Sequence, residues 1–389
     1  MPILGGAEQS LLDILRVLDR TRFRPLLLLT GPGPLAERAR ELGVPVFMVG
    51  IPGGILRRKR YHLRPFSLRT LWDGVRLLSV IWQVARLIRR ERIDVVHTNT
   101  LKAHLIGGLA ARLVGRRVVW HFRDILVDPV LRWWLVRLSR LLCDRVLAIS
   151  GAVKDQFGAG YPASRIEVIY NAVDGDEVRR LATPGDRRAI RRELGVPADA
   201  RLVGMVGQIA RWKGQEHFIR AAALLAPRFP DVRFVLVGDV LFDGEQEYRK
   251  RLPSLAGELG LERRVVFAGQ RENVYPMMRE LAVMAHCSIE PEPFGRVVIE
   301  AMALGVPVVA ATGGAMPEII EHGADGLLVR PDDPAAIAAA VSLLLEDNGL
   351  RERMTAHGRA KAAADFSRHL MAGRLGRALD PSAAVEPGS

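Results

Sequence analysis

Short apolar runs alternate with longer amphipathic stretches along most of the chain. In the first half the apolar runs predict β-strands, because each gives way to turn or polar residues after a few positions. These strands are expected at 25–29, 44–49, 94–97, 118–120 and 145–149. Apolar residues at helical spacing predict helices at 11–18, 35–42, 77–90, about 101–114 and about 131–142. This alternation indicates parallel βαβ units with both faces of the sheet covered.

The second half repeats the pattern. Strands are expected at 202–206, 233–237, 265–268, 281–285, 308–310 and 326–329, with helices between them. The pattern is weakest at 162–197, which places a boundary between two doubly wound α/β domains near residue 172. The expected parts are domains at 1–172 and 173–365, a closing helix at 366–380 that packs back toward the first domain, and a disordered tail at 381–389. Ligands of such sheets bind beyond the strand carboxyl ends, so the chemistry is expected in a cleft between the domains.

Composition narrows the class of protein. A length of 389 residues suits two domains, and 49% hydrophobic with 25% charged residues excludes a disordered or collagen-like chain. The two cysteines, Cys143 and Cys287, exclude a disulfide framework and a CxxC metal site, and they favour a reducing, cytoplasmic setting. No run reaches the ~18 apolar residues of a membrane-spanning helix, and no signal peptide is expected.

The excess of positive charge lies in the first half. Residues 1–175 hold 28 Lys and Arg against 14 Asp and Glu, whereas residues 176–389 hold 28 against 29. Two interpretations stay open: the basic half faces an anionic surface, or its arginines only keep the protein soluble. Trp133 and Trp134 stand beside arginines and suit a lipid headgroup boundary, although packing on the sheet is favoured for Trp134. The basic run at 57–60 is expected to be exposed.

The most informative segment is 290–305. Two prolines hold Glu292 in an extended loop after a strand, and Gly295 then lets the chain turn into a helix. Backbone N–H groups at 296–298 are expected to be unpaired at the helix start, which would create an anion site. Glu300 lies further along this helix and could accept hydrogen bonds from a diol such as ribose. A functional role is favoured, because burying an unpaired Glu in an apolar helix is costly.

Two glycine-containing segments are weaker when taken alone. A strand ends at Gly207, and Arg211 and Lys213 follow in a loop that suits a diphosphate, with an exposed basic loop as the alternative. Gly5 and Gly6 open the first helix, where glycines let the backbone approach a phosphate or a sugar closely.

Other motifs favour structural roles. His97 and His121 each follow a strand, where a ligand-facing side chain would lie, but a lone histidine there is more often structural. The segment 31–36 is placed like a dinucleotide-binding loop, yet its prolines remove the amides that would bind a pyrophosphate. Asp174 and Asp176 indicate a turn rather than a metal site. Nothing in the sequence requires a metal ion or a cofactor.

Taken together, these motifs resemble those of the retaining nucleotide-sugar glycosyltransferases of family four, which have the GT-B fold of two Rossmann-like domains. The resemblance extends from Gly5 to the closing helix. It is most specific at the E-x7-E element from Glu292 to Glu300, at the glycines that follow it, and at the loop containing Lys213.

The resemblance implies a role for each matched residue. Lys213 would bind the donor diphosphate, Glu300 would bind the ribose, and Glu292 would lie near the anomeric carbon of the donor sugar. His121 would lie beside the donor sugar and the reacting centre. The other implied donor-binding residues are Gly6, Gly207, Arg211, Phe294, Gly295, Val297 and Val298.

The resemblance also implies the reaction. The family transfers a sugar with retention of anomeric configuration, by front-face attack in which the leaving phosphate takes the acceptor proton, without a metal. The implied donor carries UDP in preference to GDP, and the implied acceptor is a cell-envelope polysaccharide or a glycolipid at the cytoplasmic membrane face, with no nucleic acid partner. The alternatives are a soluble small-molecule acceptor and an inactive sugar-nucleotide-binding protein.

Two positions depart from the family pattern. Gln208 stands where the family usually has Arg, and Arg211 could supply the missing charge. Only residues 1–4 precede the paired glycines, where the family has a complete first strand, so the first strand is expected to be truncated.

Overall fold

The computed structural model describes residues 5–50, 68–183, 187–241 and 243–380, apart from the side chains of 68–75, 187 and 243. The chain divides into two compact units: unit 1 comprises Met1–Ile169 with Met371–Ser389, and unit 2 comprises Tyr170–Leu370. The basic run at 57–60, the residues before Gly5 and the tail after residue 380 lie outside the described residues.

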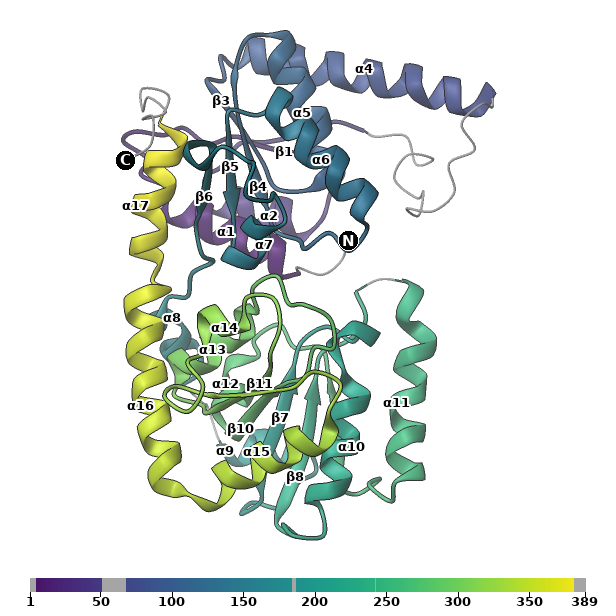
Figure 1. The fold of residues 1–389 in the computed structure, drawn as a ribbon, viewed down its shortest axis with the longest axis vertical. Helices are drawn as coiled ribbons and strands as arrows, with labels where there is room; N and C mark the ends of the chain where they lie inside the picture. The colour runs from purple at the N-terminus through teal and green to yellow at the C-terminus, as the bar shows by residue number, and fades with distance from the viewer. Residues whose placement is uncertain (1–4, 51–67, 184–186, 242, 381–389) are drawn as a thin grey trace. The chain divides into compact units, whose positions relative to one another are not determined.

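Unit 1 contains parallel strands covered by helices (Figure 1). One pair of strands is β1–β2, and a separate sheet has the order β3-β4-β5-β6 within the described residues. The strands are β1 Leu27–Leu29, β2 Val46–Met48, β3 Val95–Thr98, β4 Arg117–Phe122, β5 Arg145–Ala148 and β6 Ile166–Val168. The helices are α1 Gly6–Val17, α2 Pro34–Glu41, α4 Leu68–Arg90, α5 Leu101–Leu113, α6 Pro129–Leu142 and α7 Gly151–Asp155, with a 3-10 turn η1 at Ala163–Arg165.

Unit 2 contains one parallel sheet of six strands in the order β12-β11-β10-β7-β8-β9. The strands are β7 Arg201–Val206, β8 Val232–Val237, β9 Val265–Gly269, β10 Leu281–His286, β11 Val308–Ala311 and β12 Leu327–Val329. From β7 the chain adds strands in one direction, and from β10 it adds them in the other. The order therefore reverses between β7 and β10, and ligands of doubly wound sheets bind beside such a switch point, beyond the strand carboxyl ends.

Helices connect these strands. They are α8 Gly175–Leu181, α9 Arg187–Glu193, α10 Gln215–Leu225, α11 Gln246–Glu258, α12 Tyr275–Arg279, α13 Arg296–Leu304, α14 Met316–Ile319, α15 Pro334–Glu346 and α16 Asn348–Asp365, with 3-10 turns η2 Arg211–Lys213 and η3 Asp243–Glu245. A last helix, α17, spans Arg368–Leu379, and from Met371 onward it belongs to unit 1. There the Arg117 guanidinium donates to the backbone carbonyls of Ala378 and Asp380.

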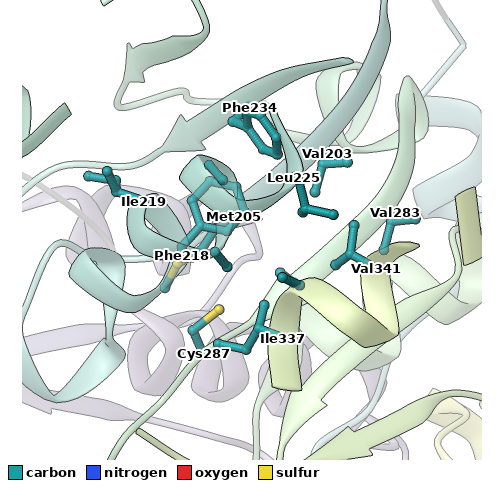
Figure 2. Packing of buried hydrophobic residues seen from close by; sticks show 14 of the residues in the cluster. Val203, Met205, Phe218, Ile219, Leu225, Phe234, Val283, Cys287, Ile337 and Val341 are labelled. Carbon is teal, nitrogen blue, oxygen red and sulfur yellow. The ribbon is translucent and has the colours of Figure 1, made fainter. Parts of the chain in front are cut away.

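The core of unit 2 explains why only loops are available at the switch point (Figure 2). Phe218 of α10 and Ile337 of α15 pack against Met205 of β7, Phe234 of β8 and Val283 of β10, and all five side chains are buried. Because the buried strand positions are almost all apolar, the functional groups are expected at the carboxyl ends of the strands and in the segments that follow them.

The predicted strands of both halves and the helix that begins after Gly295 are confirmed, within about two residues at most ends. The packing expected for Trp134 is wrong. Helix α6 buries Leu135 and Ser139, so Trp134 lies on the opposite face and is exposed. The turn expected at Asp174 is a helix start instead, because its carboxylate accepts from the Glu177 amide and caps α8.

Candidate active site

Two loops meet at the switch point of unit 2, one after β7 and one after β10. The Ile289 amide donates to the Trp212 carbonyl at 2.8 Å, which fastens one loop to the other. Gly214 has a left-handed backbone (φ 76°), and a Cβ there would lie 2.0 Å from the Cys287 carbonyl oxygen. Only glycine allows this close approach. The loops are therefore held in a fixed mutual position.

Side chains from these loops and from the last residue of β10 converge on the Glu292 carboxylate. Its Oε2 accepts from Lys213 Nζ at 2.6 Å, from His286 Nε2 at 3.1 Å and from Ser288 Oγ at 3.1 Å. A carboxylate only accepts, so the His286 proton lies on Nε2. Burial of the Glu292 carboxyl opposes its ionisation, but the Lys213 ammonium and the His286 hydrogen bond outweigh burial and hold the pKa of Glu292 well below its ordinary value. The site therefore holds a buried, ionised carboxylate.

A third loop, after β11, supports Glu292 from its backbone side. The Ala315 amide donates to the Glu292 carbonyl at 2.9 Å, and Gly314 forms an isolated parallel bridge with Glu292. A Cβ on Gly314 would lie 2.1 Å from the Glu292 carbonyl oxygen. The close approach requires glycine here as well, so the Glu292 loop is held on both sides.

Helix α13 begins where this loop ends. Gly295 (φ 84°) and Gly305 (φ 76°) cap its two ends in left-handed conformations. Glu300, which is buried, pairs with Arg296 one turn earlier, with Oε1 3.3 Å from the guanidinium. The Val298 amide donates to the Gly295 carbonyl at 2.9 Å, so the expectation that all amides at 296–298 are unpaired is wrong for Val298.

The remaining predicted donor-binding residues of unit 2 are placed as follows. Gly207 turns the chain at the end of β7, and Val297 is half-buried in the first turn of α13. The Phe294 side chain is buried among Tyr170 and Phe366, with ring centroids 5.9 Å from each, so only its backbone is available to a ligand. Arg211 is exposed and its guanidinium lies 5.1 Å above the Tyr248 ring, whereas Lys213 reaches Glu292.

A second polar cluster lies in unit 1, at the carboxyl ends of β3 and β4. His97 Nε2 lies 3.2 Å from His121 Nδ1, and the Arg123 guanidinium lies 3.3 Å from the same Nδ1. Arg123 can only donate, so His121 Nδ1 is an acceptor and its proton lies on Nε2. His121 Nε2 is buried and has no partner among the described residues. Burial, followed by the Arg123 charge, lowers the pKa values of both histidines, that of His97 to about 3. His121 is therefore a neutral imidazole with an unused hydrogen-bond donor.

Gly6 also belongs to unit 1, where it opens α1. The Gly5 amide donates to the Glu8 carboxylate at 3.1 Å, so one amide of this helix start is already bonded. The roles predicted for Gly6 and His121 toward a donor stay predictions.

Sequence reasoning missed His286 and Ser288, which hold Glu292 together with Lys213. Both follow or end an apolar strand, where polar side chains signal a role at the carboxyl edge of a sheet. No group of three or more His, Cys, Asp and Glu among the described residues is arranged to hold a metal ion.

Comparison with known proteins identifies the family and the fold. A model of the group described as Glycosyltransferase Family 4 matches residues 4–177, and a model described as Glycosyl transferases group 1 matches residues 186–361. The N-acetyl-alpha-D-glucosaminyl L-malate synthase of Bacillus anthracis is 28% identical over 298 residues, which cover 74% of this chain and 75% of that protein. The alpha-maltose-1-phosphate synthase of Mycolicibacterium smegmatis is 30% identical over 302 residues, covering 71% and 76%.

A solved structure covers nearly the whole chain. The Anabaena protein HepE, crystallised in complex with UDP and glucose, is 31% identical with a TM-score of 0.82, and the match covers 97% of each chain. The similarity between HepE and this chain extends over both parallel-sheet units. The resemblance to family-four glycosyltransferases, which the E-x7-E element and the Lys213 loop indicated, is thereby confirmed. This chain belongs to the family-four glycosyltransferases with the GT-B fold.

Proposed function

We propose that the chain transfers a glycosyl group from a UDP-sugar to a hydroxyl acceptor, with retention of anomeric configuration and without a metal ion. The observation that carries the proposal is the convergence of Lys213 and Glu292 from the loops after β7 and β10. The complex of HepE with UDP and glucose supports the choice of donor.

Lys213 is the group best placed to bind the donor diphosphate. Its ammonium is already at the switch point, and the half-buried position strengthens its attraction for a phosphate. Binding of a diphosphate would exchange the Glu292 carboxylate for phosphate oxygens around Lys213. Glu292 would then keep the hydrogen bonds from His286 and Ser288, so it would stay ionised and oriented.

The reaction itself needs charge stabilisation more than a protein nucleophile. As the bond between the sugar and the diphosphate breaks, negative charge grows on the leaving phosphate, and Lys213 with the first amides of α13 would stabilise it. In front-face attack the leaving phosphate oxygen takes the proton of the acceptor hydroxyl, and the new glycosidic bond forms on the same face. Glu300 would bind the ribose hydroxyls, and the His121 Nε2–H would donate to a hydroxyl of the donor sugar.

The proposed acceptor is a cell-envelope polysaccharide or a glycolipid, reached by peripheral association of the basic unit 1 with the inner face of the cell membrane. A soluble small-molecule acceptor is the second candidate, and the names of the malate and maltose-phosphate synthases favour it. Among the described residues no helix is long and apolar enough to cross a membrane.

A donor panel tests the proposal. The melting temperature of the purified chain is measured with UDP-sugars, GDP-sugars, free nucleotides and NAD(P), because a ligand that binds only the folded state must raise it. We expect stabilisation by a UDP-sugar, followed by turnover with a retained anomeric configuration by NMR and no loss of rate in EDTA. Stabilisation by a nucleotide without turnover on any acceptor would indicate a binding protein, and stabilisation by NAD(P) alone would overturn the proposal.

A further inference from the structure

Helix α6 of unit 1 has two apolar faces, although a helix that only covers a sheet needs one. Leu135 and Ser139 are buried on the inner face. The opposite side of the helix carries four apolar side chains, because intervals of three, one and seven residues place them on one face. They are Val130, Trp133, Trp134 and Leu141. Among the described residues of unit 1, the packing of α6 therefore leaves one apolar stripe exposed.

The side chains of this stripe are well exposed. The exposed fraction is 64% for Val130, 50% for Trp133, 54% for Trp134 and 71% for Leu141, and Val127 just before the helix reaches 74%. The two indole rings lie edge to face with centroids 4.8 Å apart. An exposed apolar patch of this kind marks an interaction site more often than isolated surface residues do.

The charged side chains of helix α6 itself are all positive. Helix α6 contains Arg132, Arg137 and Arg140 and no acidic residue. The Arg137 guanidinium lies 4.6 Å above the Trp133 ring. The carboxylate of Asp128, which precedes the helix, accepts from the amides of Val130 and Leu131 and is engaged as the helix cap. A partner for this face must therefore accept both apolar side chains and positive charge.

The stripe begins at the ligand-binding edge of the unit 1 sheet. Strand β4 ends at Phe122, and only six residues separate it from the start of α6 at Pro129, so the first turns of α6 lie near the carboxyl edge of the sheet. The same edge holds His121 and Arg123. A surface that binds at Trp133 and Trp134 would thus lie beside the edge where this kind of sheet binds its ligands.

We infer that the outer face of α6 docks on an anionic lipid surface, with Trp133 and Trp134 in the headgroup boundary and the arginines on the phosphates. Indole rings with one polar edge suit that boundary, and arginines can extend from an apolar stripe to charged headgroups. A second copy of the chain is disfavoured, since two faces of the same positive charge would repel. The inference rests on the proposed function for its purpose, which is to bring the enzyme to a membrane-bound acceptor.

Vesicle binding of the full chain tests the inference without any donor or acceptor. Co-sedimentation is measured with phosphatidylglycerol–phosphatidylcholine vesicles and with phosphatidylcholine vesicles alone, in 0.1 M and 0.5 M NaCl. We expect binding to the anionic vesicles that weakens in high salt, because exposed charges are screened. The W133S/W134S variant should bind about tenfold more weakly, and R132Q/R137Q should lose about fivefold per arginine.

A matched control removes exposed apolar side chains elsewhere. Leu224 and Leu343 of unit 2 are 57% and 45% exposed, and the L224S/L343S variant should bind vesicles like the wild type. The melting temperature of each variant shows whether it is folded. If the W133S/W134S variant fails to fold, vesicle binding of the folded R132Q/R137Q variant still tests the inference.

Three outcomes would overturn the inference. These are equal binding to both vesicle types, unchanged binding of both α6 variants, or a wild-type dimer in solution that the tryptophan substitutions dissociate while no vesicles are bound. The proposed function is judged separately by stabilisation with UDP-sugars. Vesicle binding without stabilisation by UDP-sugars would contradict the proposed function but not the docking surface. Stabilisation by UDP-sugars without vesicle binding would contradict the docking surface but not the proposed function.

Discussion

Lys213 and Glu292 form an ion pair with Nζ and Oε2 2.6 Å apart, although 79 positions separate them in the sequence. Their side chains are only 15% and 9% exposed, so the pair is largely shielded from solvent. The pair joins the two loops that follow the central strands β7 and β10. A cation that a diphosphate would bind is therefore already neutralised by a carboxylate, and donor binding must compete with this pairing.

Substitution of Lys213 by alanine should weaken donor binding. The change removes a charge-assisted contact with the diphosphate, which we expect to cost about 1–3 kcal/mol of binding free energy. It also leaves the Glu292 carboxylate buried with only His286 and Ser288, so the melting temperature should fall. Calorimetric titration with UDP measures the first effect, and thermal unfolding measures the second.

The control for Lys213 is the exposed Lys250, which pairs with Glu247 on the surface of α11. Lys250→Ala should change neither UDP affinity nor the melting temperature noticeably, because exposed ion pairs contribute little. Equal UDP affinity of Lys213→Ala and the wild type would refute the assignment of Lys213 to the diphosphate.

Substitution of Glu300 by glutamine should separate ribose binding from phosphate binding. An ionised carboxylate can accept from two ribose hydroxyls, whereas an amide offers one weaker acceptor. We expect the UDP affinity to fall by about 1–2 kcal/mol while the affinity for inorganic pyrophosphate is retained. Competition of both ligands against a fluorescent donor analogue measures the two affinities. A parallel loss of pyrophosphate affinity would show that Glu300 acts by holding Arg296, its partner at 3.3 Å.

The sequence predicted the elements better than the contacts between them. Alternating apolar runs were sufficient for the strands of both units, because strand interiors in covered parallel sheets are uniformly apolar. The Glu292 and Lys213 loops could be singled out, but their pairing depends on β7 and β10 being neighbours, which no local pattern records. The role of His286 was missed because it depends on the contact with Glu292, which the position of His286 at the end of a strand does not reveal.

The exposure of Trp134 on helix α6 also shows that a local sequence pattern does not determine how an element packs. Both faces of α6 are apolar, so periodicity could not decide which face packs on the sheet. The decision depends on how the helix is rotated against β4 and its neighbours.

Acidification should destabilise unit 1 through its buried histidines. Burial is the main cause that lowers the pKa of His104 from 6.5 to about 3, and His97 behaves similarly. The unfolded chain therefore binds protons that the folded chain excludes, and stability should fall as the pH decreases from 6.5 toward about 3. The slope should be at most roughly 1.4 kcal/mol per pH unit for each histidine.

The His104→Gln variant isolates one of these groups. Its urea unfolding midpoint should decrease less between pH 7 and pH 5 than that of the wild type, because one excluded proton is removed. Gln can still hydrogen-bond with Thr98, whose hydroxyl lies 2.6 Å from His104 Nδ1. The exposed His357 provides the control, and His357→Gln should keep the wild-type pH dependence. If the urea midpoint of His104→Gln depends on pH as strongly as that of the wild type, protonation of groups other than His104 causes the loss of stability.

Substitution of Gly314 by alanine should damage the donor site through the backbone. Gly314 has φ 58°, and a Cβ there would lie 2.1 Å from the Glu292 carbonyl oxygen and 2.6 Å from its nitrogen, so the Glu292 loop must move. Gly323 is the matched control: it also has a positive φ, of 86°, but no atom lies within 4 Å of its Cβ position. Gly323→Ala should cost only the backbone strain of about 1 kcal/mol, with UDP affinity unchanged.

Gly314→Ala should lower both the melting temperature and the UDP affinity, the latter by tenfold or more because Lys213 and Glu292 lose their alignment. Comparison of the two variants by thermal unfolding and UDP titration therefore distinguishes the effect of backbone strain from the effect of moving the Glu292 loop. If both variants lose stability equally and bind UDP equally well, the Gly314 contact does not position the site. If only Gly314→Ala loses affinity, the loop after β11 helps to hold the donor site, although the nearest atoms to a Cβ on Gly314 are backbone atoms of Glu292.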